Sequence, residues 1–169
     1  MSFYIGQVFT SEYSSEAAVW CNKNNAYITK EDGKFIIKAI PEPSLEELKE
    51  QKIKQIDKET SNAITSGFDY TINNIKYHFS YDSFDQQNFV DTASMCQLAL
   101  SGAEGLPTSV TWNSYLEDGT LVRQEFDANS FLKLYTSGAI AHKATQMVIG
   151  GQRKAAVQLA KTKEELDNI

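Results

Sequence analysis

The most regular pattern of apolar residues lies between residues 45 and 66, where apolar or small side chains recur every three or four positions. They fall on one stripe of a helix about 160° wide. The residues of this stripe are Leu45, Leu48, Ile53, Ile56, Thr60, Ala63 and Ile64. Lys, Glu and Gln fill most other positions, so the pattern predicts a long surface helix with one buried side. The seven-residue period of a coiled coil is not kept, which makes a coiled coil the less favoured alternative.

Capping signals flank this predicted helix. Ser44 and Glu47 have the spacing of a capping box, in which each side chain bonds a free backbone N–H at the helix start. Gly67 predicts the end of the helix, because glycine readily adopts the left-handed conformation that closes a last turn. Just before Ser44, Pro41-Glu42-Pro43 holds the backbone extended and excludes a helix. We therefore expect a boundary between two parts of the chain at this point.

After Gly67 the apolar residues recur at every second position, which predicts strands. The predicted strands are residues 68–72, 75–80, 109–115 and 121–126. Asn73-Asn74 lies between the first two strands and Asp118-Gly119 lies between the last two. Both dipeptides favour the positive φ angles of a tight turn, so we predict two antiparallel hairpins.

Helical patterns follow each of these hairpins. Ser83 and Gln86 are spaced as a capping box that opens a helix through Leu100. Asp127 caps a second helix, whose stripe is Phe131, Leu134, Tyr135, Gly138, His142, Thr145 and Ile149. Gly150-Gly151 predicts a kink or break in it. A last capping box starts at Thr162 and predicts a short terminal helix.

Residues 1–41 predict a smaller unit made of a strand, a helix and a hairpin. The strand is residues 7–10, and Ser14 or Ser15 caps a helix over residues 16–22. Asp32-Gly33 marks the turn of the hairpin. The sequence thus predicts an α+β fold with a strand-helix-hairpin unit at 1–41. Residues 44–169 then form a domain with a long helix, two antiparallel hairpins and C-terminal helices.

Composition limits the classes of partner. The net charge is −6 and the only arginines are Arg123 and Arg153, so the chain has little to neutralise phosphates and we expect no nucleic acid. No run approaches the roughly 20 apolar residues that span a bilayer, so we expect no membrane insertion. The first residues show no basic segment followed by an apolar run, which predicts a soluble protein made in the cytoplasm.

The residues that usually carry chemistry are sparse. Cys21 and Cys96 form no CxxC motif, and His78 and His142 form no HxH or HExxH motif. A metal site needs at least three such donors in workable geometry, so we predict no metal, no cofactor and no catalytic residue. A pairing of Cys96 with either histidine stays open, because such partners meet only in the folded chain.

Two carboxylates leave a hydrolase alternative open. Asp82 and Asp85 lie beside aromatic residues near a predicted helix start, and glycosidases use two carboxylates that flank a sugar-binding cleft. Acidic residues are also common at helix starts, where they cap the backbone and complement the helix dipole. We favour the capping role.

Several segments carry a family resemblance. They are Gly67-Phe68-Asp69-Tyr70, Tyr77-His78-Phe79-Ser80-Tyr81-Asp82, Asp85-Gln86-Gln87-Asn88-Phe89, Val110-Thr111-Trp112, Asp118-Gly119 and the run from Ala155 to Ile169. With them, residues 44–169 resemble a phage and prophage domain family of unknown function. The helix around Trp20, the hairpin after it and the segment from Pro41 to Leu48 resemble short phage proteins encoded near tail-fibre genes, some of which are called tail-fibre assembly proteins.

This resemblance implies a bacteriophage setting. We expect a non-catalytic virion structural protein of the tail, as a baseplate or tail-fibre attachment component, made in the host bacterial cytoplasm. Its partners would be other phage tail or tail-fibre proteins and further copies of itself, in a homo-oligomer. One alternative is a tail-fibre assembly chaperone absent from the mature virion. A less favoured one is a cell-wall or polysaccharide hydrolase.

Aromatic side chains of the small N-terminal unit are the candidate protein interface. Phe3, Tyr4 and Trp20 are residue types that often anchor protein–protein contacts. A unit of about 40 residues buries too little surface to be very stable alone, so it needs a further surface to pack on. That surface could belong to a partner or to the rest of the same chain, and the sequence leaves both open.

Overall fold

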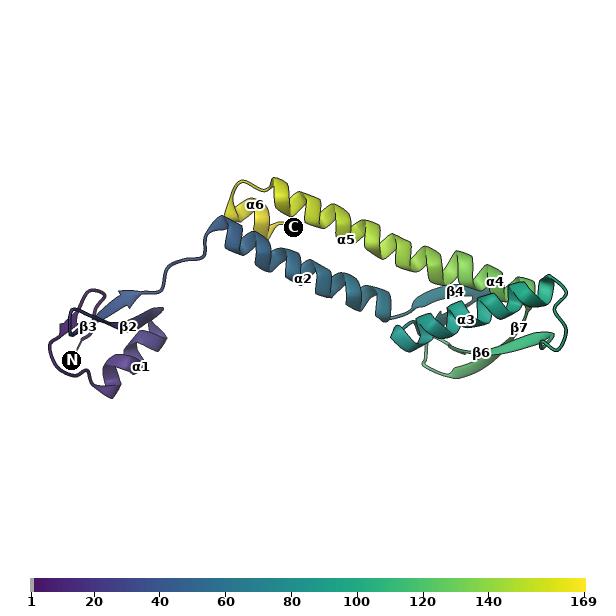
Figure 1. Ribbon diagram of the computed structural model, residues 1–169, viewed down its shortest axis with the longest axis horizontal. Helices are drawn as coiled ribbons and strands as arrows, with labels where there is room; N and C mark the ends of the chain where they lie inside the picture. The colour runs from purple at the N-terminus through teal and green to yellow at the C-terminus, as the bar shows by residue number, and fades with distance from the viewer. Residues whose placement is uncertain (1) are drawn as a thin grey trace. The chain divides into compact units, whose positions relative to one another are not determined.

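The computed structural model describes residues 2–169, which divide into two compact units (Figure 1). The first unit ends at Ser44 and the second is Leu45–Ile169. Each unit combines helices with one antiparallel sheet, which confirms the predicted α+β class.

The first unit packs one helix against a three-stranded sheet of order β1-β3-β2. Its elements are β1 (Val8–Phe9), α1 (Ser15–Lys23), β2 (Ala26–Glu31) and β3 (Lys34–Ala39). Ser14 is the N-cap of α1, and its hydroxyl accepts a hydrogen bond from the Ala17 N–H. Asp32 and Gly33 both have positive φ at the turn between β2 and β3, as the Asp-Gly pair predicted. Cys21, together with residues of β2 and β3, forms a small buried core.

The second unit contains all the remaining elements. They are α2 (Leu45–Thr65), β4 (Phe68–Ile72), β5 (Ile75–Phe79), α3 (Ser83–Leu100), β6 (Ser109–Tyr115), β7 (Leu121–Asp127), α4 (Ala128–Leu134), the π-helix η1 (Tyr135–Ile140), α5 (Ala141–Leu159) and α6 (Lys163–Asp167). The four strands form a sheet of order β4-β5-β6-β7. Asn73 and Asn74 have φ of 50° and 65°, as the β4–β5 turn requires.

We call β4 to β7 with α3, α4 and η1 the sheet end of this unit. Its core is a cluster of aromatic rings contributed by both strands and helices. The buried aromatic members are Phe68, Phe79, Tyr81, Phe89, Phe126 and Phe131. Tyr70 and Tyr77 pair across β4 and β5, and both pack against this cluster. Their neighbours along each strand therefore face the other side of the sheet.

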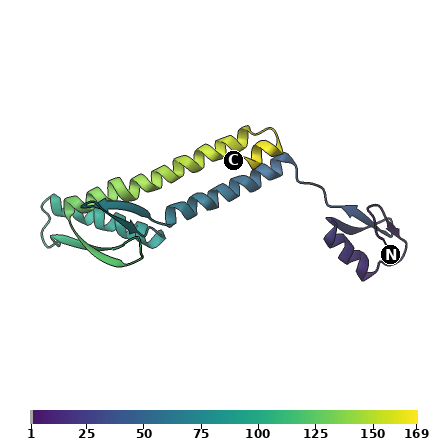
Figure 2. The same ribbon diagram turned by 180° about the vertical axis from the view of Figure 1, so that it is seen from behind.

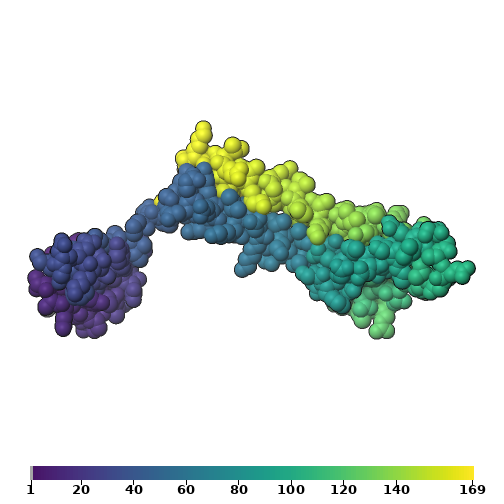
Figure 3. Space-filling view, in the orientation of Figure 1, coloured from purple at the N-terminus to yellow at the C-terminus, as the bar shows by residue number. Residues whose placement is uncertain are grey.

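We call α2, α5 and α6 the helical arm. Helices α2 and α5 run antiparallel and side by side, as both ribbon views show (Figures 1 and 2). Ile56, Val157, Ala160 and Leu166 form its small buried core, and Leu45, Leu48 and Ile53 pack against it. The stripe predicted for α2 is therefore the face that is buried. In the space-filling view, α5 forms one long edge of this unit (Figure 3).

The break predicted at Gly150-Gly151 is wrong, because α5 continues through both glycines. Gly150 is buried against α2, and a Cβ atom there would lie 2.3 Å from Thr60 Oγ1. A Cβ at Gly151 would meet nothing within 4 Å. The first glycine thus lets two helices approach closely, which is a packing role that its sequence neighbours do not reveal.

The helix irregularity lies instead at η1. The Ala141 N–H donates to the Thr136 carbonyl, five residues earlier, which is the hydrogen bond of a π turn. Such a turn holds one extra residue, so the buried positions beyond it come one place later than an unbroken α-helix predicts. Thr145 and Ile149 were predicted to be buried and are exposed; Gln146 is half-buried and Gly150 is buried in their place.

The predicted cap of α3 is also wrong by one residue. Asp82 is the N-cap, and one of its carboxylate oxygens accepts from the N–H groups of Phe84 and Asp85, both at 2.8 Å. Ser83 is the first residue of the helix, and the Gln86 side chain donates to the Tyr81 carbonyl. A carboxylate that reaches two N–H groups makes the stronger cap, because its hydrogen bonds are charge-assisted.

Candidate functional site

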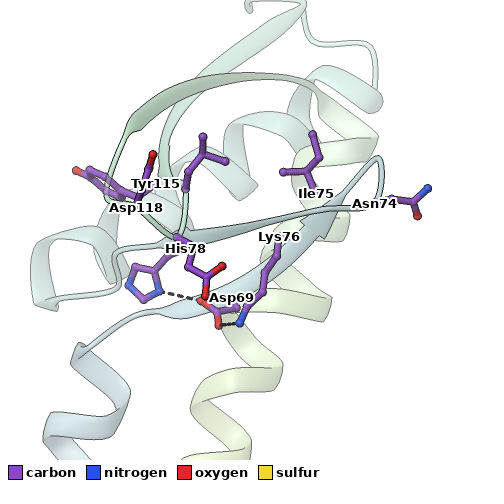
Figure 4. A pocket seen from close by; sticks show the side chains of 9 residues that line it. Asp69, Asn74, Ile75, Lys76, His78, Tyr115 and Asp118 are labelled. Carbon is purple, nitrogen blue, oxygen red and sulfur yellow. Dashed lines mark hydrogen bonds and ion pairs between the residues drawn. The ribbon is translucent and has the colours of Figure 1, made fainter.

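A hollow of about 620 Å³ opens where β5 and β6 separate (Figure 4). These two strands pair in register only at His78 and Tyr115, so the first half of β5 and the turn after β6 form opposite walls. The polar residues that line the hollow are Asp69, Asn74, Lys76, His78, Tyr115, Glu117 and Asp118. Asp69, Lys76 and His78 alternate with residues of the aromatic cluster, so they lie on the opposite face of the sheet.

Asp69 is the centre of the charges in this hollow. Its two carboxylate oxygens lie 2.7 Å from Lys76 Nζ and 3.0 Å from His78 Nδ1. The hydrogen bond from Lys76, and then that from His78, lowers the pKa of Asp69. The same ion pair raises the pKa of Lys76. Because Asp69 pairs with His78 in the β4–β5 register, the hairpin itself places these groups together.

Both ring nitrogens of His78 are engaged. Nδ1 faces the Asp69 carboxylate, and Nε2 lies 3.0 Å from the Ser66 carbonyl oxygen. A carboxylate and a carbonyl oxygen are both hydrogen-bond acceptors, so both contacts are hydrogen bonds only when the ring carries two protons. In this arrangement the ring holds the end of α2 to the hairpin.

Gly67 makes this contact possible. Its φ is +94°, and a Cβ atom there would lie 2.6 Å from His78 Nε2 and 2.3 Å from the Phe79 carbonyl oxygen. The sequence predicted only that Gly67 ends α2. The packing of His78 on its backbone was not predicted, because the signal for it is a close approach in space.

The other wall of the hollow is acidic. Glu117 and Asp118 belong to the β6–β7 turn, and the Asp118 carboxylate accepts from the Thr120 N–H at 2.9 Å. That hydrogen bond lowers the pKa of Asp118, which stays ionised at neutral pH. The hollow therefore presents fixed carboxylates beside one ion pair. This arrangement suits hydrogen bonding to a polar or cationic group of a bound partner.

The carboxylates of the hydrolase alternative lie outside this hollow. Asp82 caps α3 through two hydrogen bonds, and Asp85 is in the first turn of the same helix. Both occupy positions that favour negative charge because of the free N–H groups and the helix dipole.

Both histidines have partners other than Cys96 in the structure. Cys96 is buried in the aromatic cluster, and burial raises the pKa of its thiol, so the thiol form predominates at neutral pH. His142 packs against the rings of Phe68 and Tyr81. Its Nε2 lies 3.1 Å from the Ala63 carbonyl oxygen, which ties α5 to α2. Within residues 2–169, no three His, Cys, Asp or Glu side chains form a group that could hold a metal ion.

The three candidate interface residues divide into two kinds. Phe3 and Trp20 pack together, with ring centroids 6.4 Å apart, against the core of the first unit. Tyr4 is 63% exposed. The structure thus brings Phe3 and Trp20 into the unit's own core and leaves Tyr4 on the surface. Their role in binding a partner stays a prediction.

Comparison with known proteins identifies a family and no relative of known function. Residues 47–169 match the family described as "Domain of unknown function (DUF4376)", close to the boundaries of the predicted second domain. No curated protein and no solved structure matches the chain. Among the helices of residues 2–169, none combines the length and apolar character needed to cross a membrane. The match covers most of the sequence, so the chain belongs to the DUF4376 family.

Proposed function

We propose that this protein is a non-catalytic structural component of a phage tail, at the baseplate or the tail-fibre attachment point, and that it acts through protein–protein contacts. The phage setting rests on the sequence resemblance described above. The observation that carries the contact role is the number of large apolar side chains exposed on both units. They include Tyr4, Ile5, Val19, Tyr27, Phe84, Met147, Val148 and Leu159. Met147, Val148 and Leu159 gather along one helix, α5, and exposed apolar groups that gather on a surface mark interaction sites.

The polar groups favour binding over turnover. A general base needs a lone pair that reaches a substrate proton. Both nitrogens of His78 instead face oxygen atoms of the same chain, and Asp69 is shared between His78 and Lys76. Asp82 is committed to the start of α3. These groups maintain the fold around a polar hollow, and that is a suitable surface for a protein partner.

Mass spectrometry of purified virions tests the proposed location. We expect the protein in virions at a fixed copy number relative to the major tail proteins. The alternative, an assembly chaperone, is favoured by the short length and acidic net charge of the chain. It predicts that the protein is abundant in infected cells and missing from purified virions, and that result would overturn the structural role.

A substitution at the α3 cap tests the hydrolase alternative. Asn accepts the same N–H hydrogen bonds as Asp, so Asp82→Asn retains the cap while removing the charge. We expect no release of soluble sugar from cell walls or capsular polysaccharide by the unsubstituted protein. Hydrolysis by that protein, lost in Asp82→Asn or Asp85→Asn variants of unchanged stability, would establish an enzyme instead.

A further inference from the structure

Helix α5 has two opposite faces of different chemistry. One face packs on α2 through His142, Gly150 and Val157. At about 100° per residue, the opposite side forms an outer face that begins at the last residue of η1. The residues of this outer face are Ile140, Ala144, Met147, Val148, Gly151, Ala155 and Leu159. Four of them are large and open to solvent, with exposed fractions of 44% for Ile140, 59% for Met147, 58% for Val148 and 77% for Leu159.

The outer face has no charged side chain. The cations of α5 lie to its sides and are bonded within the same chain. Lys143 Nζ donates to Gln86 Oε1, Arg153 pairs with Glu59, and Lys154 pairs with Asp57, at distances of 2.9, 2.7 and 2.7 Å. A surface helix usually carries charges opposite its buried face, as α2 does with its exposed Lys and Glu residues. The outer face of α5 departs from that rule along its whole length.

The apolar surface widens at the start of α5. Met147 borders a shallow hollow of about 290 Å³, whose apolar lining includes Tyr81, Val90 and Ile140. Val90 belongs to α3 and is 44% exposed, so α3 extends the outer face sideways. Elements of the same unit leave the outer side of α5 uncovered in both ribbon views (Figures 1 and 2).

Six of the seven residues of the outer face are related in pairs about its centre, and Met147 falls opposite Gln152, a polar residue outside this face. A two-fold axis between Ile149 and Gly150 relates residues at equal distances on each side. The pairs, from the centre outward, are Val148 with Gly151, Ala144 with Ala155, and Ile140 with Leu159. Two antiparallel helices crossing at this point place a large side chain against glycine, small against small, and large against large. A face that complements itself in this way is the requirement for a two-fold symmetric dimer.

The charges beside the outer face are compatible with this pairing. Lys143 and Lys154 lie on the same flank of the outer face, so Lys143 of one copy comes near Lys154 of the other, whose charge is already paired with Asp57. A partner of opposite charge would be expected to match charges on this face, and the face has none. The uncharged and self-complementary surface therefore favours a second copy of the chain over an unrelated protein.

We propose that the outer face of α5 pairs with the same face of a second copy, antiparallel, to form a homodimer. The two arms then make a bundle of four long helices. Residues 140–159 span about 30 Å, and a contact of this length with Val90 at its side is near the low end of stable interfaces, about 600 Å² per copy. We expect a dissociation constant in the micromolar range. The proposal is independent of the phage setting, since association of the purified protein and its presence in virions are separate measurements.

Sedimentation velocity over about 1 to 200 μM protein tests the association. We expect the unsubstituted chain to shift from monomer to dimer over this range. Val148→Glu puts two carboxylates at the centre of the interface and should weaken the dimer at least about tenfold. Gln51→Glu adds the same charge at an exposed site of α2 and should leave the dimer intact. A monomer at every concentration, or equal effects of the two variants, would overturn the proposal.

Cysteine crosslinking tests the antiparallel geometry and does not depend on the charged variant. The native Cys21 and Cys96 are buried and unpaired. A mixture of Ala144→Cys and Ala155→Cys chains should form a mixed disulfide dimer on mild oxidation, while Ala144→Cys alone should crosslink far less. Efficient crosslinking of Ala144→Cys with itself indicates parallel helices and overturns the proposed pairing. Circular dichroism of each variant verifies that the fold is retained.

Discussion

The sheet end and the helical arm of the second unit are held together in different ways. The sheet end is built on large rings, and Phe89 alone contacts Phe68, Tyr81, Trp112, Phe131 and Tyr135. The arm has a core of only four buried aliphatic residues among those that the structure describes, with no buried ring. Elsewhere along the arm, α2 and α5 are joined by the contact of Gly150 with Thr60 and by ion pairs. One region is complete by itself, whereas the other leaves an apolar helix face in solvent.

This difference indicates which region contributes more to the free energy of unfolding. Aromatic rings bury the most surface per residue and add specific ring contacts. The ion pairs Arg153–Glu59 and Lys154–Asp57 are partly exposed, and such pairs contribute little in water. The sheet end therefore supplies most of the folding free energy of this unit, and the arm is the region that gains most from a further partner.

Truncation of a core ring should have the largest effect. Phe89 is fully buried, with its ring centroid 4.3 Å from that of Trp112, so Phe89→Ala should lower the free energy of unfolding by about 3–5 kcal/mol. Ile56→Ala in the arm removes fewer buried atoms and should cost about 2 kcal/mol. Urea unfolding followed by circular dichroism measures both. A larger loss for Ile56→Ala would reverse the order of the two regions.

The two glycines of α5 should respond in opposite directions. Gly150→Ala forces a methyl group against Thr60 and should destabilise the protein by about 1–3 kcal/mol. Gly151→Ala has open space and should stabilise the helix by about 0.5–1 kcal/mol. Thermal unfolding at a protein concentration too low for association separates the two. Equal changes in the two variants would show that the contact between Gly150 and Thr60 has room for a methyl group.

The cap of α3 should contribute an intermediate amount to the sheet end. Asp82→Ala leaves the N–H groups of Phe84 and Asp85 without their acceptor and should cost about 1 kcal/mol. Asp82→Asn keeps an acceptor in place and should lower the free energy of unfolding by only about 0.3 kcal/mol. The free energies of unfolding of the three proteins give the comparison. If both variants lost the same amount, charge rather than capping would be the dominant contribution.

The smallest effect should come from the ion pair in the polar hollow. The pKa of Asp69 is lowered in the folded state, so its contribution to stability is present above the unfolded pKa of about 3.9 and is lost as pH falls through the folded value. Asp69 is about half exposed and Lys76 is mostly exposed, so this contribution is below about 1 kcal/mol. Asp69→Asn should be less stable than the unsubstituted protein at pH 7, and the difference should disappear once the pH falls below the folded-state pKa of Asp69. A difference that persists in acid would indicate a packing defect instead.

Local signals in the sequence predicted most of the fold. Asp32-Gly33, Asn73-Asn74 and Asp118-Gly119 each mark a turn, because each residue pair has a conformational preference of its own. The single stripe of α2 was also predicted correctly, since the helix is regular over its full length.

Features that depend on close approach in space were missed. Gly150 was interpreted as a helix break because its contact with Thr60 lies 90 positions away in the sequence. The polar hollow required His78 to reach both Asp69 and Ser66, and no spacing rule encodes that pair of contacts. The uncharged outer face of α5 was likewise not predicted, since η1 shifts the position of every later residue around the helix.

The π turn is also a place where the chain can change length without moving a helix face. Because this turn holds one extra residue, removing one residue from Tyr135–Ile140 would let the segment become regular α-helix. The residues beyond it would keep their angular positions, so Gly150 would still face Thr60, and Met147 and Val148 would still lie at the surface. The same deletion within the regular part of α5 would instead turn the rest of that helix by about 100° about its axis and displace both faces.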